Sequence, residues 1–275
     1  MAVIPCAEMM PIYGRIDLQQ KRGARSKLLD ETSYETVKRD LRPAAITAIP
    51  NRVYDLYMSR LAEDGMFFYP FYKVKMTNGF MHNEVPAKLD DPSSFTSGCI
   101  TKEIEVAKEL KRLYGIYRNK DSSKKTTKDA DKKIGELLGY PDCCCEFYSH
   151  LENYDPVYES ALGGDHSFFN SELYCLNSDP ALFQHLRYFG INITPWFPCS
   201  YSCKESRRRS EVWFNVMKSL NLQLAEEILN LLKKPSTWDL YNGQVLITHE
   251  DFLGYVTSYF PKVRKVVHFN QGDIK

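Results

Sequence analysis

The 275-residue chain contains no apolar run near the roughly 20 residues that span a bilayer, so we expect no transmembrane segment and no membrane partner. The stretch from Met1 to Gly14 has neither a basic n-region nor a developed apolar h-region, so we expect no secretory signal peptide. These absences predict a cytoplasmic protein. In the cytosol cysteines stay reduced, and clustered cysteines more often bind a metal or act in catalysis than form disulfides.

An excess of charge and several familiar motifs are also missing. With 36 basic and 35 acidic residues the net charge is +1, so no global basic field attracts nucleic acid, and any such contact would need a local patch. The absence of GxGxxG, P-loop and HExxH motifs argues against a nucleotide-binding fold and a zincin protease. The CxxxCxxC triplet of radical enzymes is absent too.

What the chain does contain is a local concentration of cysteine. Three of its eight cysteines are consecutive, within GYPDCCCEFYSH from Gly139 to His150, and two more lie within PWFPCSYSC, as Cys199 and Cys203. The other three are isolated, which is typical of buried thiols. Among these, Cys175 lies between the two stretches and is a further candidate ligand.

Helix signals place both cysteine stretches at helix starts. Pro141 suits a first helical position and Asp142 a first turn, so residues 143–145 are expected in the first turn of a helix. Ser202-Cys203-Lys204-Glu205 has capping-box spacing and opens a periodic segment that predicts one helix to Lys234. The unpaired N–H groups and partial positive charge of a helix start favour the thiolate, the form that binds metal or attacks.

We predict that the two stretches meet and that Cys143, Cys144, Cys199 and Cys203 hold a metal centre. Four thiolates satisfy either a tetrahedral zinc ion or a [4Fe–4S] cluster. Successive helical residues point about 100° apart, so the three consecutive cysteines cannot all face one ion, and Cys145 is either a core-filling thiol or an extra ligand. Adjacent ligands reach two corners of a cluster more easily than two corners of one ion, which favours iron–sulfur over zinc.

Two other functions would use the same cysteines. In metal-free chemistry, Cys143 or Cys144 would be a nucleophile that carries a persulfide or forms a disulfide with Cys199 or Cys203. In the other alternative, a structural zinc ion stabilises a module that binds nucleic acid or protein. Whether the chain is a redox or modification enzyme or a binding protein stays open, as does its substrate.

Charged residues near the cysteines are candidates for catalysis and ligand binding. Glu146 and His150, at i and i+4 on one helix face, would supply a general acid and base, or ligands for a harder metal, unless they form a surface ion pair. Arg207, Arg208 and Arg209 follow Cys203 by one turn. They would bind a phosphate or a nucleic-acid backbone, with Arg207 and Arg208 as cofactor-binding residues, unless they form a solvated helix face.

Hydrophobic periodicity predicts a predominantly helical α+β protein. We expect a small amount of β-strand near residues 66–76 and in the C-terminal tail. Residues 1–30 are predicted to form a basic N-terminal arm, and 31–275 a single α-rich domain with a mobile, lysine-rich loop at 119–131.

The two stretches together resemble a known family. Gly139-Tyr140-Pro141-x-Cys143-Cys144, with Phe147 after it, and Pro198-Cys199-x-x-x-Cys203-x-x-Ser206 are similar to archaeal and bacterial proteins of unknown function built around a Gly-Tyr-Pro-x-Cys-Cys motif. The resemblance covers roughly 135–250, under half of the chain. It implies that the four cysteines are the functional set, and it brings no established activity. Such proteins often have histidine just before the Pro-Cys pair, where this chain has Phe197.

Overall fold

The structure is a computed structural model of the 275-residue chain. It describes residues 16–76, 84–86, 94–119, 122–150, 179–184, 187, 190–233, 236–239, 244–249, 252–257 and 266–269. The chain divides into two compact units, residues 30–154 and residues 1–29 with 155–275. Compactness does not test independent folding, so the single domain expected over 31–275 stays a prediction.

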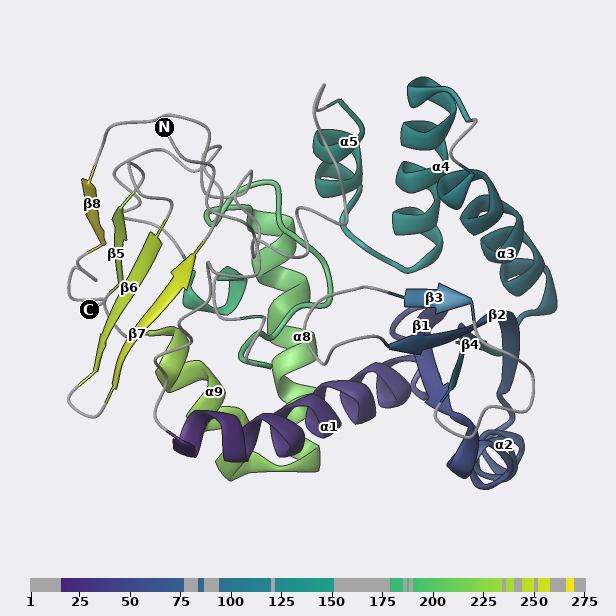
Figure 1. The fold of residues 1–275 in the computed structure, drawn as a ribbon, viewed down its shortest axis with the longest axis horizontal. Coiled ribbons are helices and arrows are strands. Elements are labelled where there is room, and N and C mark those ends of the chain that lie inside the picture. The colour runs from purple at the N-terminus through teal and green to yellow at the C-terminus, as the bar shows by residue number, and fades with distance from the viewer. Residues whose placement is uncertain are drawn as a thin grey trace. The chain divides into compact units, whose positions relative to one another are not determined.

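The unit of residues 30–154 is built on an antiparallel sheet of order β1-β4-β2-β3 (Figure 1). Its strands are β1 (Ala44–Pro50), β2 (Phe67–Met76), β3 (Glu84–Pro86) and β4 (Phe95–Thr101). β2 confirms the strand predicted near 66–76, and Pro70 lies at an irregularity in its pairing with β4, where a missing N–H is tolerated. Gly98 lies in β4, where a Cβ atom would come within 2.3 Å of the Tyr69 carbonyl oxygen, so only glycine fits.

Both faces of this sheet are covered. Neighbouring residues of a strand point to opposite faces, and accordingly Cys99 and Ile100 of β4 belong to different core clusters. Ile100 packs with Tyr34 of α1 (Ile16–Lys38) and Leu61 of α2 (Tyr54–Glu63), which follows a 3-10 turn, η1 (Asn51–Val53). Cys99 packs with side chains of α3 (Ile104–Arg118) and α4 (Lys124–Leu137).

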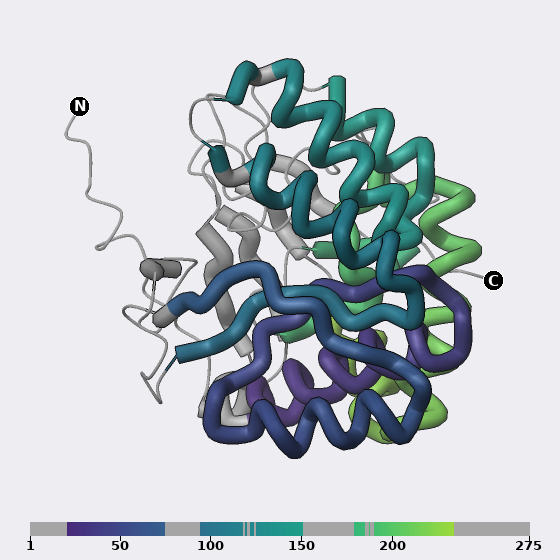
Figure 2. Tube along the Cα trace, turned by 90° about the vertical axis from the view of Figure 1, so that its right-hand side faces the viewer, coloured from purple at the N-terminus to yellow at the C-terminus, as the bar shows by residue number. Residues whose placement is uncertain are grey.

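The helices α3, α4 and α5 (Asp142–His150) lie side by side in that order (Figures 1 and 2). The prediction of a mobile loop over 119–131 is wrong from residue 124, because α4 begins there. The Ser123 side chain accepts a hydrogen bond from the N–H of Thr126 and caps the helix. Ala130, Ile134 and Leu138 recur every four residues and are buried, so a stripe sparse in apolar residues still joins the core.

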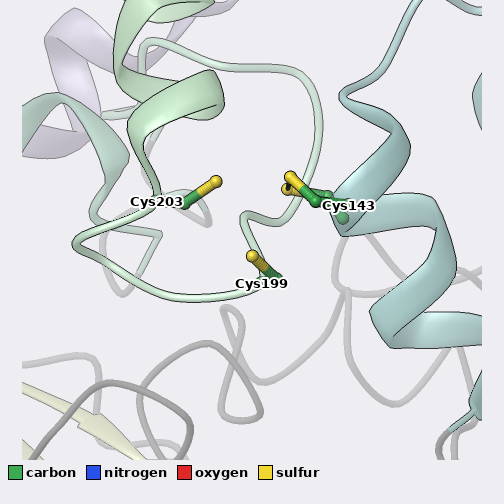
Figure 3. Close-up of side chains that lie close together, drawn as sticks. Cys143, Cys199 and Cys203 are labelled. Atoms are coloured by element: carbon green, nitrogen blue, oxygen red, sulfur yellow. Dashed lines mark hydrogen bonds between the residues drawn. The ribbon is translucent and has the colours of Figure 1, made fainter.

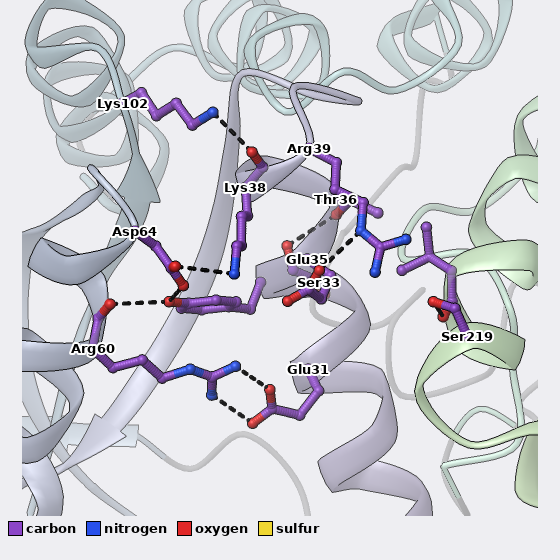
Figure 4. A network of polar contacts seen from close by, with 12 residues as sticks. Glu31, Ser33, Glu35, Thr36, Lys38, Arg39, Arg60, Asp64, Lys102 and Ser219 are labelled. Carbon is purple, nitrogen blue, oxygen red and sulfur yellow. Dashed lines mark hydrogen bonds and ion pairs between the residues drawn. The ribbon is translucent and has the colours of Figure 1, made fainter.

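The arm predicted over 1–30 is also wrong from residue 16, where α1 begins. In the unit of residues 30–154, polar contacts connect the C-terminal part of α1 with α2 (Figure 4). Arg60 forms a two-pronged ion pair with Glu31, at 2.8 and 2.6 Å, and lies 3.9 Å over the ring of Tyr34. The Tyr34 hydroxyl donates to the Asp64 carboxylate at 2.5 Å. Within residues 16–30 the side chains of Arg25 and Leu28 are buried, so the basic composition of this segment hides a packed helix.

The other unit combines helices with a second antiparallel sheet, of order β7-β6-β5-β8. Its elements are the 3-10 turn η2 (Pro180–Leu182), α8 (Lys204–Leu220), α9 (Leu222–Leu232), β5 (Ser236–Asp239), β6 (Gln244–His249), β7 (Phe252–Thr257) and β8 (Val266–Phe269). The single helix predicted from 203 to 234 is wrong, because the extended residue Asn221 ends α8 and caps α9 by accepting from the N–H of Leu224.

The predominantly helical α+β class is confirmed. Across the described residues, every helix is either too short or too polar to cross a bilayer.

Candidate metal centre

Helix α5 begins after a sharp turn at the end of α4. Gly139 has a φ of +73°, and a Cβ atom there would lie 2.9 Å from Cβ of Arg42, so glycine is required on both counts. The N–H of Tyr140 donates to the Gly135 carbonyl at 2.9 Å and closes α4. Pro141 stands just before α5 and its carbonyl accepts from the N–H groups of residues 144 and 145. The Gly-Tyr-Pro sequence thus starts the cysteine helix.

The three consecutive cysteines do not all face the same space. Cys143 is exposed, whereas Cys144 and Cys145 are buried. Cys145 packs against α4, since a Cβ atom on Gly135 would lie 2.6 Å from its sulfur. The Sγ atoms of Cys143 and Cys144 are 4.0 Å apart. Two of the three thiols are therefore neighbours, and the third fills the space between two helices.

Cys203 is the N-cap residue of α8, one residue after Ser202, which the capping-box spacing predicted as the cap. Its Sγ atom accepts a hydrogen bond from the N–H of Ser206 at 3.4 Å, in the place usually taken by an oxygen. Ser206 is fully buried and its hydroxyl accepts from the indole N–H of Trp196 at 3.1 Å. The Trp196 ring packs edge-to-face on Trp213 of α8, with centroids 5.2 Å apart. Buried aromatic packing therefore fixes the start of α8.

A second polar network holds the segment before Cys199. The Gln184 amide donates to the Thr194 hydroxyl at 2.9 Å, and both side chains are fully buried. The Arg187 guanidinium donates to the Pro195 carbonyl at 2.9 Å and lies 4.9 Å over the ring of Phe197. Sequence reasoning missed these residues, because no local pattern reveals contacts that form only when the loop folds back on itself.

The sulfur atoms of Cys143, Cys144, Cys199 and Cys203 all lie within 4.8 Å of one another. Figure 3 shows the side chains of Cys143, Cys199 and Cys203 turned toward a common space. Among the described residues, this is the one group of metal-ligating side chains close enough to hold an ion. The four cysteines can therefore bind a metal ion. Cys175 lies outside the described residues.

Glu146 and His150 lie at the surface of α5. The Glu146 carboxylate pairs with the Lys132 ammonium of α4, and this hydrogen bond holds the pKa of Glu146 below its usual range. Nδ1 of His150 is 2.8 Å from the Glu146 backbone oxygen and 3.4 Å from its carboxylate. Glu146 and His150 are thus in contact at the surface of α5, and an acid–base role for the two residues stays a prediction.

The three arginines of α8 each contact a carboxylate. Arg207 pairs with Asp179 at 2.8 Å, while Arg208 and Arg209 pair with Glu205 at 2.7 and 2.9 Å. Hydrogen bonds from Arg208 and Arg209 lower the pKa of Glu205 to about 2, so it is charged at neutral pH. Acidic neighbours offset much of this positive charge, and phosphate or nucleic-acid binding by these arginines stays a prediction.

Comparison of the chain with models of known protein families, with curated proteins and with solved structures gives no match. The resemblance to the Gly-Tyr-Pro-x-Cys-Cys family therefore stays a prediction.

Proposed function

We propose that the protein is a metalloprotein in which Cys143, Cys144, Cys199 and Cys203 bind one metal ion, most simply zinc, in a structural site. The observation that carries this proposal is the mutual separation of the four sulfur atoms, at most 4.8 Å. Cysteine thiolates are preferred ligands of zinc, and four of them complete its coordination.

The sulfur spacing favours a single ion over the cluster suggested by the adjacent cysteines. Zinc–sulfur bonds of 2.3 Å in a tetrahedron put the sulfurs about 3.8 Å apart. In a [4Fe–4S] cluster each thiolate binds a different iron atom, so the four sulfurs must be farther apart than on one ion. The 4.0 Å between the sulfurs of Cys143 and Cys144 is close to the tetrahedral value.

Four protein ligands also favour a structural role. Catalytic zinc sites keep a coordination position open for water or substrate, whereas structural sites are closed by four side chains. Here the thiols of Cys144 and Cys203 are buried. The start of α8, where Cys203 lies, is fixed by the buried hydrogen bond between Trp196 and Ser206. A closed site suits a binding module better than a hydrolase.

An iron–sulfur cluster is the second candidate, since it also takes four cysteine thiolates. Both Cys143–Cys144 and Cys203 lie at helix starts, where the partial positive charge stabilises an anionic cluster. It would support electron transfer or a modification reaction, and it requires the four sulfurs to move apart.

Anaerobic purification followed by elemental analysis and absorption spectroscopy tests the proposal. A colourless protein with about one zinc ion per chain supports it. About four iron atoms per chain with broad visible absorption would replace it by the cluster. A protein without either metal would end both readings and leave metal-free thiol chemistry, which alkylation mapping would detect as one hyper-reactive cysteine.

A matched pair of variants makes the test specific. Cys199→Ser removes a proposed ligand and should reduce bound metal to near background. Cys145→Ser changes a thiol in the same triplet whose sulfur faces Gly135, so it should keep its metal. Equal metal contents in the two variants would contradict the ligand assignment.

A further inference from the structure

A polar cleft of about 380 Å³ lies between helices α4 and α5. From α4 it is lined by Lys125, Lys128, Asp129 and Lys132. From α5 it is lined by Glu146, Ser149 and His150. All of these residues belong to the unit of residues 30–154.

The cleft carries more positive than negative charge. Lys125, Lys128 and Lys132 are spaced three and four residues apart, so they share one face of α4. Glu146 neutralises Lys132, but neither Lys125 nor Lys128 is ion-paired with a carboxylate in the part of the chain that the structure describes. The first turn of α4 contains no acidic residue. Asp129 is the remaining acid, so one lysine charge is left uncompensated.

Hydrogen-bonding groups of α5 face the same cleft. His150 has a side chain 72% exposed, and Nδ1 is its nitrogen next to the Glu146 backbone oxygen. Because Nδ1 faces the Glu146 backbone oxygen, Nε2 is the ring nitrogen that can face a ligand in the cleft. The Ser149 hydroxyl lies beside it and donates to the Glu146 carbonyl at 2.8 Å. Cationic and neutral polar groups thus converge from two helices.

We propose that this cleft binds a phosphate group, with Lys125 and Lys128 as its cationic contacts and His150 as an additional hydrogen-bond donor. A phosphate ester carries close to two negative charges and three acceptor oxygens, which suits several donors arriving from different directions. The cleft is not a cation site, because the described metal-ligating groups close enough to hold an ion are the four cysteines alone. It also differs from the arginines of α8, since each of those three arginines is ion-paired with a carboxylate.

The position of the cleft on α5 suggests the size of the ligand. His150 follows Cys143 by seven residues, which corresponds to about 10 Å along a helix and a rotation of about 20°. The exposed Cys143 and His150 therefore lie on nearly the same helix face. A ligand held by its phosphate would extend along α5 toward Cys143, and a nucleotide has this length. Phosphate binding itself does not depend on a metal at the cysteines.

Isothermal titration calorimetry of the full chain with inorganic phosphate and with pyrophosphate tests the proposal. We expect saturable binding of one anion per chain, and a roughly tenfold weaker Kd in Lys125→Ala and in Lys128→Ala. Lys133→Ala is the matched control, because Lys133 lies on the same helix, pairs with Glu136 at 2.8 Å and is outside the cleft. No binding of either anion, or equal weakening by the control, would overturn the proposal.

A second arm separates a small phosphorylated ligand from a nucleic-acid backbone. Binding of a single-stranded oligonucleotide is measured between about 50 and 200 mM salt, where the slope of log K against log salt is about −0.7 per neutralised phosphate. A slope that corresponds to one or two neutralised phosphates supports a small phosphorylated ligand. A steeper slope with tighter binding that is lost in Lys128→Ala supports a backbone phosphate in the same cleft. If Lys125→Ala and Lys128→Ala both bind the oligonucleotide and pyrophosphate with an unchanged Kd, the assignment of the cleft is contradicted.

The Cys199→Ser variant keeps the two proposals distinguishable. It should lose its metal while binding pyrophosphate with an unchanged Kd, because Cys199 is not part of the cleft. Far-UV circular dichroism would confirm that the variant folds. Retained metal in Lys128→Ala, with phosphate binding weakened about tenfold, would give the converse separation.

Discussion

The two cysteine segments reach the same local arrangement, a sulfur at the start of a helix, by different physical means. Cys143 and Cys144 are positioned by backbone geometry: a left-handed Gly139 and Pro141 turn the chain from α4 into α5. Cys203 is positioned by side chains, through the buried pair of Trp196 and Ser206. Backbone geometry can be read locally, whereas a side-chain network requires the folded loop. The two segments should therefore respond to different substitutions.

The largest expected effect comes from a substitution in the Gly139 turn between α4 and α5. Gly139→Val places a β-branched residue at a φ of +73° and brings its Cβ within 2.9 Å of Arg42. We expect a loss of about 3 kcal/mol in unfolding free energy, since left-handed strain and overpacking add. Thermal unfolding with metal analysis measures it.

Gly115→Ala provides the control for that substitution. No heavy atom lies within 4 Å of a Cβ atom built at this position in α3. Alanine should therefore stabilise the helix by up to about 1 kcal/mol. Equal destabilisation by the two glycine substitutions would contradict the strain argument.

Removing the buried hydrogen bond between Trp196 and Ser206 should have the next largest effect. Ser206→Ala leaves the indole N–H of Trp196 buried without its hydroxyl acceptor, which costs about 2 kcal/mol. We expect a lower melting temperature together with weaker metal retention during dialysis against a chelator. Ser202→Ala, at an exposed position beside Cys203, should change neither quantity.

A smaller effect tests the packing of Cys145. Gly135→Ala brings a methyl group within 2.6 Å of the Cys145 sulfur, and we expect a loss of about 1–2 kcal/mol after the gain in helix propensity. Adding Cys145→Ala should recover most of it, because the colliding sulfur is gone. A double-mutant cycle in urea measures the coupling. Additive losses would show that Cys145 does not pack against Gly135.

The smallest expected effect is a difference in pH dependence. Burial raises the pKa of Asp131 on α4 from 3.8 to about 6. The folded state then binds the Asp131 proton more tightly than the unfolded state. The stability that this proton contributes is fully present below about pH 4 and is lost as pH rises through about 6. Asp131→Asn should remove this fall and make the protein more stable at pH 7 than the wild type.

Glu205 on α8 should contribute a pH dependence of stability with the opposite sign. Its pKa is lowered to about 2 by Arg208 and Arg209, so its contribution is present above pH 4.5 and is lost as pH falls toward 2. Glu205→Gln should flatten the acid limb of the stability curve and leave the limb between pH 4 and 6 unchanged. Urea unfolding across pH 2–8 records both limbs.

Local signals predicted the features that depend on neighbouring residues. The strand with Pro70 at its irregularity and the helix starts near Cys143 and Cys203 follow from short-range rules, although α8 is capped one residue after the predicted Ser202. The misses were the N-terminal parts of α1 and α4, whose charged composition masks a few buried positions such as Leu28 and Ala130. Asn221 was missed as a break because its extended conformation interrupts an otherwise continuous apolar stripe.

Local sequence signals are enough to place Cys143 and Cys144 in the first turn of one helix and Cys203 at the start of another. Helix capping and periodicity act over three or four residues, so they can be read from the chain. The tertiary fold sets the packing of Cys145 against Gly135 and brings four sulfurs within 4.8 Å of one another. It likewise decided that lysines of α4 meet His150 of α5 in one cleft. Distances between segments remote in the chain depend on which side chains pack, and no local rule contains that information.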